Sequence, residues 1–537
     1  MKKAIALLLA VVMVLALAAC GKQSAQPAAA QPAQEAAAPA AEGAAEQGSG
    51  RLPLVRVGIS DDVATLDPLG DNGQGRYMVL QSCCEYLCSL EGVGGKMEGV
   101  IAESWEQTDT YTYIVKIYDY VYDCAGNHIT ASDVAFSYNK CIELGLQGMV
   151  LNMIVSVTAL DDYTVEFKVN SDAAGCMLNT LTGVMIVSEK AYEEDPDHMA
   201  NKPVGTGAYV VTEFTPGSTI KMVRNENYWQ KPELTNWYSK SNVDAIEFQV
   251  IMEPAQLALA LETGTVDIAG YVPQNEADSF EGNPDFNIFI QNNLMSQVLL
   301  FNVASPFASK ELRQAVLYCI DNAAILQNVF GGKGVVNHDF SNEIYPDYIE
   351  AWHDRDYYDY NVEKAKELVA ASGMDLTGMK FKLMTTSSPT QVRMAQLIQA
   401  YMHEIGIETE IVSYDSSLYI GYSFDPTQWD LRLDTRGAGD YVSSVYKYAY
   451  DQDMYGSITV NFYTDEDLQV LLRAAMSEET HNEETINAFS EAVNELALGY
   501  GIITDYVNYV GNASVVKDVT YNWFQKLMPG ACEYVVG

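Results

Sequence analysis

The stretch KFKLMTTSSPTQVRMAQLIQAYMHEIGIETEIV, residues 380–412, combines two β-strand patterns with one helix pattern. Lys380–Thr385 is a short strand-like run, and Ile407–Val412 alternates apolar with polar residues, as a strand does. Between them an apolar stripe at helical spacing ends at Gly406. Its members are Met394, Leu397, Ile398, Tyr401, Met402 and Ile405. Two strands joined by a helix are parallel, with a right-handed crossover, so this stretch predicts an α/β fold.

Two further helix starts carry capping residues. Thr130–Asp133 has the spacing of a capping box. Asp321 can cap another helix, and Gly331–Gly332 should end it because glycine readily adopts the left-handed conformation found after helices. These signals extend the α/β pattern beyond the first stretch.

The N-terminus has the pattern of a bacterial secretion signal. Lys2 and Lys3 precede an apolar run, Ala4–Ala19, that falls short of a membrane-spanning helix. The run ends in Leu-Ala-Ala-Cys20, which resembles a lipobox, in which the cysteine is acylated and becomes the first mature residue. We expect residues 1–19 to be a signal peptide and Cys20 to be the lipidation site. The alternative is an ordinary signal with an incidental cysteine.

The segment that follows has the composition of a linker. Residues 20–50 consist almost entirely of Ala, Gln, Pro, Glu, Gly and Ser and contain no aromatic residue. Such a segment cannot bury enough apolar surface to offset its ordering entropy. We therefore expect a disordered tether that holds the folded body off the membrane.

The remaining chain, residues 51–537, is longer than one hydrophobic core usually supports, so we expect two or three lobes. Hydrophobic residues make up 48% of the sequence, which is typical of globular proteins, and the net charge is −41. A body this acidic should repel nucleic acid and anionic lipid. The acidity fits either a solubilising coat or a field that attracts cationic solutes, and its spread along the whole chain favours the coat.

The sequence contains no recognisable catalytic or metal-binding motif. Apart from Cys20, its cysteines lack the paired spacing of a zinc site, although Cys84 and Cys88 would share a helix face. Gly205-Thr-Gly207 begins a G-x-G motif but lacks the third glycine. We expect no metal, no cofactor and no catalytic residue. The cysteines are interpreted as small buried hydrophobic residues in reduced form, because a chain this long does not need disulfides.

Several short segments together resemble one family, the peptide- and nickel-binding solute receptors of ABC importers, also called family 5. In chain order these are Thr65–Pro68, Ala102–Trp105, Gly126–Tyr138, Pro203–Tyr209, Arg224–Trp229, Leu261–Ile268, Arg313–Ala315 with Ile320–Asp321, Tyr360–Leu368 and Glu404–Ile407. Each segment alone is a weak match, but together they cover nearly the whole mature body. Most of them have structural explanations, such as the buried aromatic anchors Trp105, Tyr209 and Trp229.

The resemblance implies a two-lobed fold of the periplasmic-binding-protein type, namely type II in its large class with an extra inserted domain. Lobe 1 would be discontinuous, formed by residues 51–75, 205–290 and 507–537. The inserted domain would span 76–204 and lobe 2 would span 291–506. The lobes would close on a ligand by rotating about segments near Asn292 and Asp505.

The resemblance also implies ligand-binding residues in the cleft between the lobes. These are Asp62, Ala64, Phe136, Arg436, Gly437, Ala438, Gly439 and Asp440. Asp440 matches the carboxylate that pairs with a peptide's α-ammonium, although an aspartate in a glycine-rich turn is an equally good interpretation. Arg436 stands near the position where the family usually carries a tryptophan, and it offers a bidentate grip on a carboxylate instead.

The expected function is therefore capture of a small ligand, a short peptide in the first instance, outside the cell. The alternatives are an acidic peptide, a nickel or other metal chelate, a modified amino-acid compound, a surface hydrolase with the same anchor, or a sensory receptor. The expected partners are the solute, the permease subunits of an ABC importer and the membrane through the lipid anchor. We expect a monomer on the outer face of the cell membrane, or in the periplasm if an outer membrane is present.

Overall fold

The computed structural model describes residues 50–536 except 71–73, 93–95, 147–150, 152, 171–175, 356, 438–440, 453–460 and 478. The chain divides between Ser49 and Gly50, and only the unit that begins at Gly50 lies within the described residues. The expected signal peptide, Cys20 and the tether up to Ser49 lie outside them, as do Ala438, Gly439 and Asp440.

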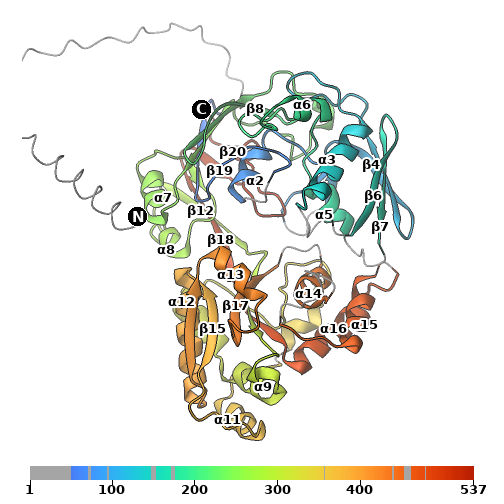
Figure 1. The fold of residues 1–537 in the computed structure, drawn as a ribbon. Coiled ribbons are helices and arrows are strands. Elements are labelled where there is room, and N and C mark those ends of the chain that lie inside the picture. The colour runs from blue at the N-terminus through green and yellow to red at the C-terminus, as the bar shows by residue number, and fades with distance from the viewer. Residues whose placement is uncertain are drawn as a thin grey trace, which may run out of the picture. The chain divides into compact units, whose positions relative to one another are not determined.

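A mixed sheet of twelve strands forms the framework of this unit (Figure 1). Along its main path the strands are β16 (Thr409–Tyr414), β15 (Phe381–Thr386), β17 (Leu431–Arg436), β13 (Ser296–Phe301), β18 (Gly499–Asn512), β11 (Ile268–Ala269), β1 (Val55–Ile59), β10 (Ala245–Val250), β9 (Thr219–Arg224) and β8 (Tyr209–Thr215). Two more strands, β12 (Phe286–Asn292) and β14 (Gly334–Val336), also pair with β18. Strand β18 therefore joins the two halves of the sheet.

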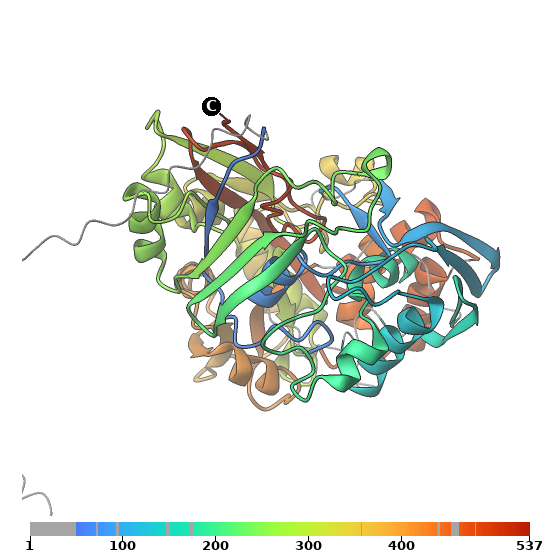
Figure 2. The same ribbon diagram turned by 90° about the horizontal axis from the view of Figure 1, so that it is seen from above.

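We call the two halves lobe 1 and lobe 2. The first part of β18 pairs with β13 and β14 in lobe 2, and its last part pairs with β11 and β12 in lobe 1. In lobe 1, β1 pairs in parallel with β10 and β11. Figure 2 shows β8, β9 and β10 in green beside the blue β1 and the dark-red C-terminal strands of this lobe. These include β19 (Val516–Asp518) and β20 (Glu533–Tyr534).

Lobe 2 has helices on both faces of its sheet. Alternate residues of β13 serve the two faces, because Leu299 and Phe301 belong to one core cluster and Val298 and Leu300 to another. The first face is covered by α9 (Lys310–Cys319), α10 (Asn322–Phe330), α11 (Val362–Ala371) and α12 (Pro389–Glu404). The second is covered by α14 (Val442–Tyr450), α15 (Glu466–Met476) and α16 (Glu483–Leu496). A short helix, α13 (Ser416–Ser423), follows β16.

The predicted strand–helix–strand unit is confirmed. β15 pairs in parallel with β16, with Phe381 opposite Thr409, and α12 lies between them in the chain. The second strand starts at Thr409 and not at Ile407, because the Ile407 N–H donates to the Met402 carbonyl and closes the end of α12. Gly406 at this turn has a φ of +83°, which glycine tolerates best.

Both predicted helix caps are also confirmed. The Asp321 carboxylate accepts from the Ala324 N–H at 2.8 Å, and α10 ends at Gly331 in the left-handed conformation. The Thr130 N–H donates to Asp133 Oδ2 at 2.8 Å at the start of α3 (Ala131–Glu143). Gly205 and Gly207 both lie against the backbone of Cys83, since a Cβ at Gly205 would lie 2.0 Å from the Cys83 carbonyl oxygen and a Cβ at Gly207 would lie 2.6 Å from the Cys83 carbonyl carbon. Close backbone contact, and not a special backbone angle, therefore requires glycine there.

A separate four-stranded sheet follows lobe 1's first segment in the chain. Its order is β4 (Ala102–Asp109), β5 (Thr112–Ile117), β7 (Thr164–Val169) and β6 (Ile154–Asp161). Helix α3 packs on it together with α5 (Cys176–Gly183) and α6 (Glu189–Glu194) in one core cluster. The short elements α2 (Gln74–Leu80), β2 (Cys88–Leu90) and β3 (Met97–Gly99) precede it, and α2 contributes Met78–Leu80 to the core of lobe 1.

Candidate functional site

Two strand connections cross between the lobes at the same place. The chain passes from β12 to β13 through Asn293, and β18 passes between the lobes at Asp505. The Asn293 N–H donates to the Asp505 carbonyl, and the Asn293 side-chain amide donates to the Asp505 carboxylate, both at 3.0 Å. The two connections are thus fastened to each other where a rotation between the lobes would be centred.

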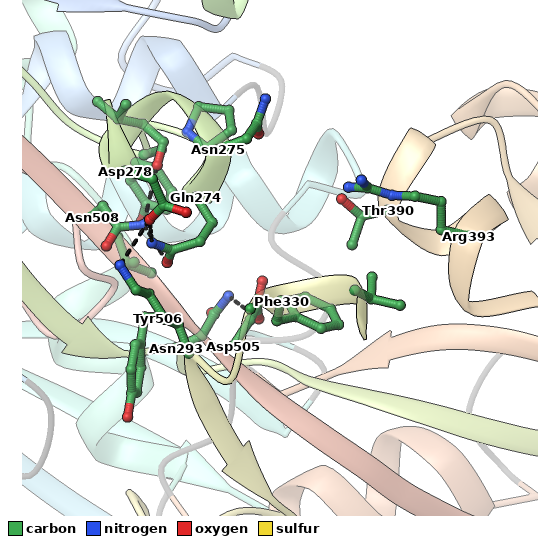
Figure 3. Close-up of a pocket in the computed structure, with 17 residues that line it drawn as sticks. Gln274, Asn275, Asp278, Asn293, Phe330, Thr390, Arg393, Asp505, Tyr506 and Asn508 are labelled. Carbon is green, nitrogen blue, oxygen red and sulfur yellow. Dashed lines mark hydrogen bonds and ion pairs between the residues drawn. The ribbon is translucent and has the colours of Figure 1, made fainter. Parts of the chain in front are cut away.

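A cavity of about 270 Å³ lies beside this crossing (Figure 3). Lobe 1 contributes the loop after β11 and the short helix α8 (Gln274–Asp278), and lobe 2 contributes the end of α10, the loop after it and the first turns of α12. The middle of β18 forms the remaining wall. Parallel strands β1, β11 and β15 end on this side of their sheets, which is where α/β folds place ligands.

The lobe 1 wall of the cavity is rich in hydrogen-bond acceptors and amides. Asn508 donates to the Gln274 side-chain oxygen at 3.2 Å, and Gln274 donates to Asp278 at 2.6 Å. Tyr271 lies at the edge of this wall with a φ of +56°, a conformation that non-glycine residues seldom adopt. Polar side chains in fixed positions of this kind give a cavity specificity for the polar groups of a ligand.

The lobe 2 wall carries positive character. Thr390 and Arg393 lie in the first turns of α12, where unpaired N–H groups and the helix dipole favour negative charge. Pro389 fits the first helical position because its missing N–H would have no partner there. Arg393 is exposed and forms no ion pair with any residue that the structure describes. Figure 3 shows its guanidinium extending toward the open space of the cavity.

The carboxyl group of Asp505, at the crossing, has a raised pKa. Burial raises the pKa of Asp505 to about 6, against the lowering effect of the hydrogen bond from Asn293. Since Asp505 also lines the cavity, its charge changes within the mildly acidic range. No group of three or more His, Cys, Asp or Glu side chains within the described residues could hold a metal ion.

Two of the site residues expected from sequence, Arg436 and Gly437, lie near the crossing but outside this cavity. Arg436, at the end of β17, donates to Asp434 at 2.6 Å. A Cβ on Gly437 would lie 2.5 Å from the Leu294 carbonyl oxygen, so this residue packs directly against the connection between β12 and β13. Ala438, Gly439 and Asp440 fall outside the described residues.

The other expected site residues lie in lobe 1 and on the inserted sheet's helix α3. Asp62 and Ala64 are exposed in the loop after β1. Phe136 is half-buried and its ring centroid lies 5.8 Å from that of Tyr192, whose hydroxyl donates to Asp67 at 3.2 Å. The structure thus connects Phe136 to the loop after β1 through Tyr192, but brings none of these residues to the cavity wall.

Sequence reasoning missed Thr390 and Arg393. Both follow Thr386, the last residue of β15, within one or two helical turns. The carboxyl end of a parallel strand is a general location for ligand-binding residues, so the strand–helix–strand pattern held the signal that could have identified them.

The fold and this crossing are those of a two-lobed periplasmic-type solute-binding protein, a class of binding proteins and not of enzymes. The chain matches the model of the bacterial extracellular solute-binding proteins, family 5, over residues 96–467, and it belongs to that family. The described residues include no helix that is long and apolar enough to cross a membrane.

Three known proteins illustrate the similarity. Heme-binding protein A of Haemophilus influenzae is 24% identical over 60% of this chain and 63% of its own length. Di/tripeptide-binding protein 1 of Pseudomonas aeruginosa is 24% identical over 62% of this chain and 66% of its own length. The solved structure of the ABC transporter substrate-binding protein CtaP from Listeria monocytogenes has a TM-score of 0.78, 20% identity, and covers 91% of this chain and 100% of that chain. The chain thus matches less than two thirds of the length of these curated relatives.

Proposed function

We propose that this protein captures a short peptide between its lobes and delivers it to an ABC-type importer. The observation that carries the proposal is the polar cavity of about 270 Å³ beside the crossing of the two lobes. Rotation about that crossing would enclose a ligand and present a closed surface to the permease. The energy for closure would come from the ligand's higher affinity for the closed arrangement.

The charges around the cavity favour a ligand with a carboxylate. Arg436 already has a carboxylate partner at 2.6 Å, whereas Arg393 is free to bind one. We therefore assign the carboxyl end of the ligand to Arg393 and Thr390, and we keep Asp440 as the proposed partner of the α-ammonium. Asp62, Ala64, Phe136 and the 436–439 segment would extend the cleft away from the cavity.

Relatives of this chain include proteins named for heme and for di- and tripeptides. A cavity of about 270 Å³ with amide, carboxylate and guanidinium groups on its walls suits a small polar solute better than a large apolar macrocycle. This argument supports the peptide over heme. A metal chelate with free carboxylates is the remaining alternative, because it too would satisfy Arg393.

Native mass spectrometry of the purified protein tests the proposal. A co-purified mixture of short peptides is the expected result. If a single metal complex is found instead, the ligand is a metal chelate and not a peptide. The same peptides should be recovered intact after a day with the protein, since a binding protein releases its ligand unchanged. Reproducible cleavage that follows the protein through purification would favour a hydrolase instead.

We further propose that Cys20 is lipidated and that the protein is held on the outer face of the cell membrane, or in the periplasm of a cell with an outer membrane. Lipidation adds membrane affinity in proportion to the buried acyl chain. The variant Cys20→Ser should leave the membrane fraction with its body folded. Retention of the folded variant on membranes would contradict the lipobox interpretation.

A further inference from the structure

A lysine from lobe 2 reaches across the cavity rim to two acids of lobe 1. Lys333 Nζ lies 2.8 Å from Asp278 Oδ1 and also forms an ion pair with Glu281. Asp278 is the last residue of α8, and Glu281 follows it in the next turn. We call these three side chains the rim triad. It is a direct charged contact between the lobes.

The backbone around Lys333 is held close to the crossing. Gly331 ends α10 in the left-handed conformation, and Gly334, with a φ of +144°, pairs with Asp505 in β18. A Cβ on Gly334 would lie 2.5 Å from the Thr504 carbonyl oxygen, so only glycine allows this approach. Lys333 therefore leaves lobe 2 from a rigid turn next to the crossing.

The Asp278 side chain is also held in position by its own lobe. Gln274 donates to Asp278 Oδ1 at 2.6 Å and is itself held by Asn508 of β18. The Asp278 oxygen thus receives both a side-chain amide of its own lobe and the ammonium of the other lobe. Figure 3 shows Gln274, Asp278 and Asn508 together on one wall of the cavity.

The triad lies at the boundary between the cavity and solvent. Lys333 and Asp278 line the cavity, and their side chains are 24% and 45% exposed, while Glu281 is 55% exposed. Exposure increases from the cavity outward along the triad. A ligand extending in this direction would meet the ion pair before it reached solvent.

We propose that Lys333, Asp278 and Glu281 form a latch that closes one rim of the cavity, favours the closed arrangement of the lobes and excludes ligands too long to fit behind it. This inference rests on the proposed capture of a solute between the lobes. Lys333 is a specificity-determining residue in this scheme, because a longer peptide gains its extra contacts only by breaking the ion pair.

Exposed ion pairs contribute little to folding, but they can shift an equilibrium between two conformations that differ by only a few kcal/mol. A contribution typical of an exposed pair changes such an equilibrium by roughly two- to fivefold. Salt weakens it because the side chains are partly solvated. The latch should therefore appear as a modest change in closure that disappears at high ionic strength.

The first arm of the test needs no ligand. Small-angle scattering should give Lys333→Met a larger radius of gyration than wild type at low salt, and equal values at about 1 M salt, where the screening length is about 3 Å. Lys221→Met is the matched control, because Lys221 pairs with Glu213 at 2.9 Å within the β8–β9 hairpin. Scattering curves that coincide for all three proteins at low salt would overturn the latch.

The second arm uses trialanine and hexaalanine in calorimetry. Lys333→Met should bind trialanine about two- to fivefold more weakly than wild type does. The variant should also prefer trialanine over hexaalanine less strongly than wild type does. An equal preference for trialanine in the variant and in wild type would show that the latch does not exclude longer peptides. If neither peptide binds wild type, the proposed peptide function fails, and the scattering arm alone decides on the latch.

A variant with the charges of the rim triad reversed controls for misfolding of Lys333→Met. The combined substitution Lys333→Glu, Asp278→Lys and Glu281→Lys keeps the attraction with the charges reversed. It should restore the wild-type radius of gyration and peptide preference. Failure of this protein to recover either property, with an unchanged melting temperature, would show that the triad's attraction is not what closes the rim.

Discussion

The side-chain amide of Gln525 bridges the backbone on both sides of Asn293: its oxygen accepts from the Leu294 N–H at 2.9 Å, and its nitrogen donates to the Asn292 carbonyl. Gln525 has a φ of +58°, and its own carbonyl accepts from the Tyr509 hydroxyl at 2.6 Å. A loop near the C-terminus therefore supplies the hydrogen bonds that the β12–β13 connection does not obtain from a neighbouring strand.

Replacing Gln525 with Met should lower the free energy of unfolding by about 1–3 kcal/mol, because it leaves a buried N–H and a carbonyl without partners. Urea denaturation measures the change. Glu is an informative comparison, since Gln525→Glu can still accept from Leu294 but cannot donate to Asn292. Stability equal to wild type in the Met variant would mean that water replaces the amide and that the bridge is dispensable.

Asp505 should give the protein a pH-dependent stability in the acidic range. Its pKa is raised to about 6, whereas an aspartate in an unfolded chain titrates near 3.9. The folded protein holds the proton more tightly, so the stabilising contribution is complete below about pH 4 and is lost as the pH rises through about 6.

Asp505→Asn removes this titration while keeping the size of the side chain. Between pH 4 and pH 7 the unfolding free energy of wild type should fall by about 2–3 kcal/mol relative to the variant. The comparison cancels other groups, such as Glu85, whose pKa is raised to about 7 by burial in both proteins. Parallel pH profiles of the two proteins would contradict the raised pKa.

Arg393→Gln tests whether Arg393 binds the carboxylate of the ligand, as proposed. Affinity for trialanine should fall roughly tenfold, because a charge-assisted hydrogen bond is replaced by a neutral one. Trialanine amide, which lacks the carboxylate, should bind both proteins with similar affinity. The control is Arg473→Gln on α15, where the arginine pairs with the exposed Glu466. An equal loss for the free acid and the amide would remove Arg393 from the ligand's carboxyl end.

Gly437→Ala should disturb the crossing from the lobe 2 side. The added Cβ would lie 2.5 Å from the Leu294 carbonyl oxygen and 2.9 Å from the Met295 Cα, and backbone atoms cannot move aside easily. We expect a loss of about 1–3 kcal/mol in unfolding free energy. Gly421→Ala is the control: nothing lies within 4 Å of its Cβ, and alanine favours a helix, so stability should rise or stay constant.

Local patterns predicted the parts of the fold that depend on near neighbours. The apolar stripe of α12, the cap at Asp321 and the stop at Gly331 follow from residues within a few positions of one another. The start of β16 was misplaced because Ile407 is used to close α12 before the strand begins. That choice depends on packing, which a period-two pattern does not record.

The candidate site was harder to predict because its contacts join distant segments. Gln525 and Leu294 are 231 positions apart, and Lys333 meets Asp278 only once the lobes are assembled around β18. The expected residues Arg436 and Gly437 were identified by family resemblance. Arg393 carries no local signal beyond its position in a helix that follows a parallel strand.

Strand β18 passes without interruption through both halves of the sheet. We therefore expect each lobe expressed alone to be unstable, because it would lack part of its central pairing partner. Heating should melt both lobes in a single cooperative transition, and backbone amides of β18 should exchange with deuterium only through global unfolding. The proposed rotation of the lobes would therefore leave both of them joined through one continuous strand.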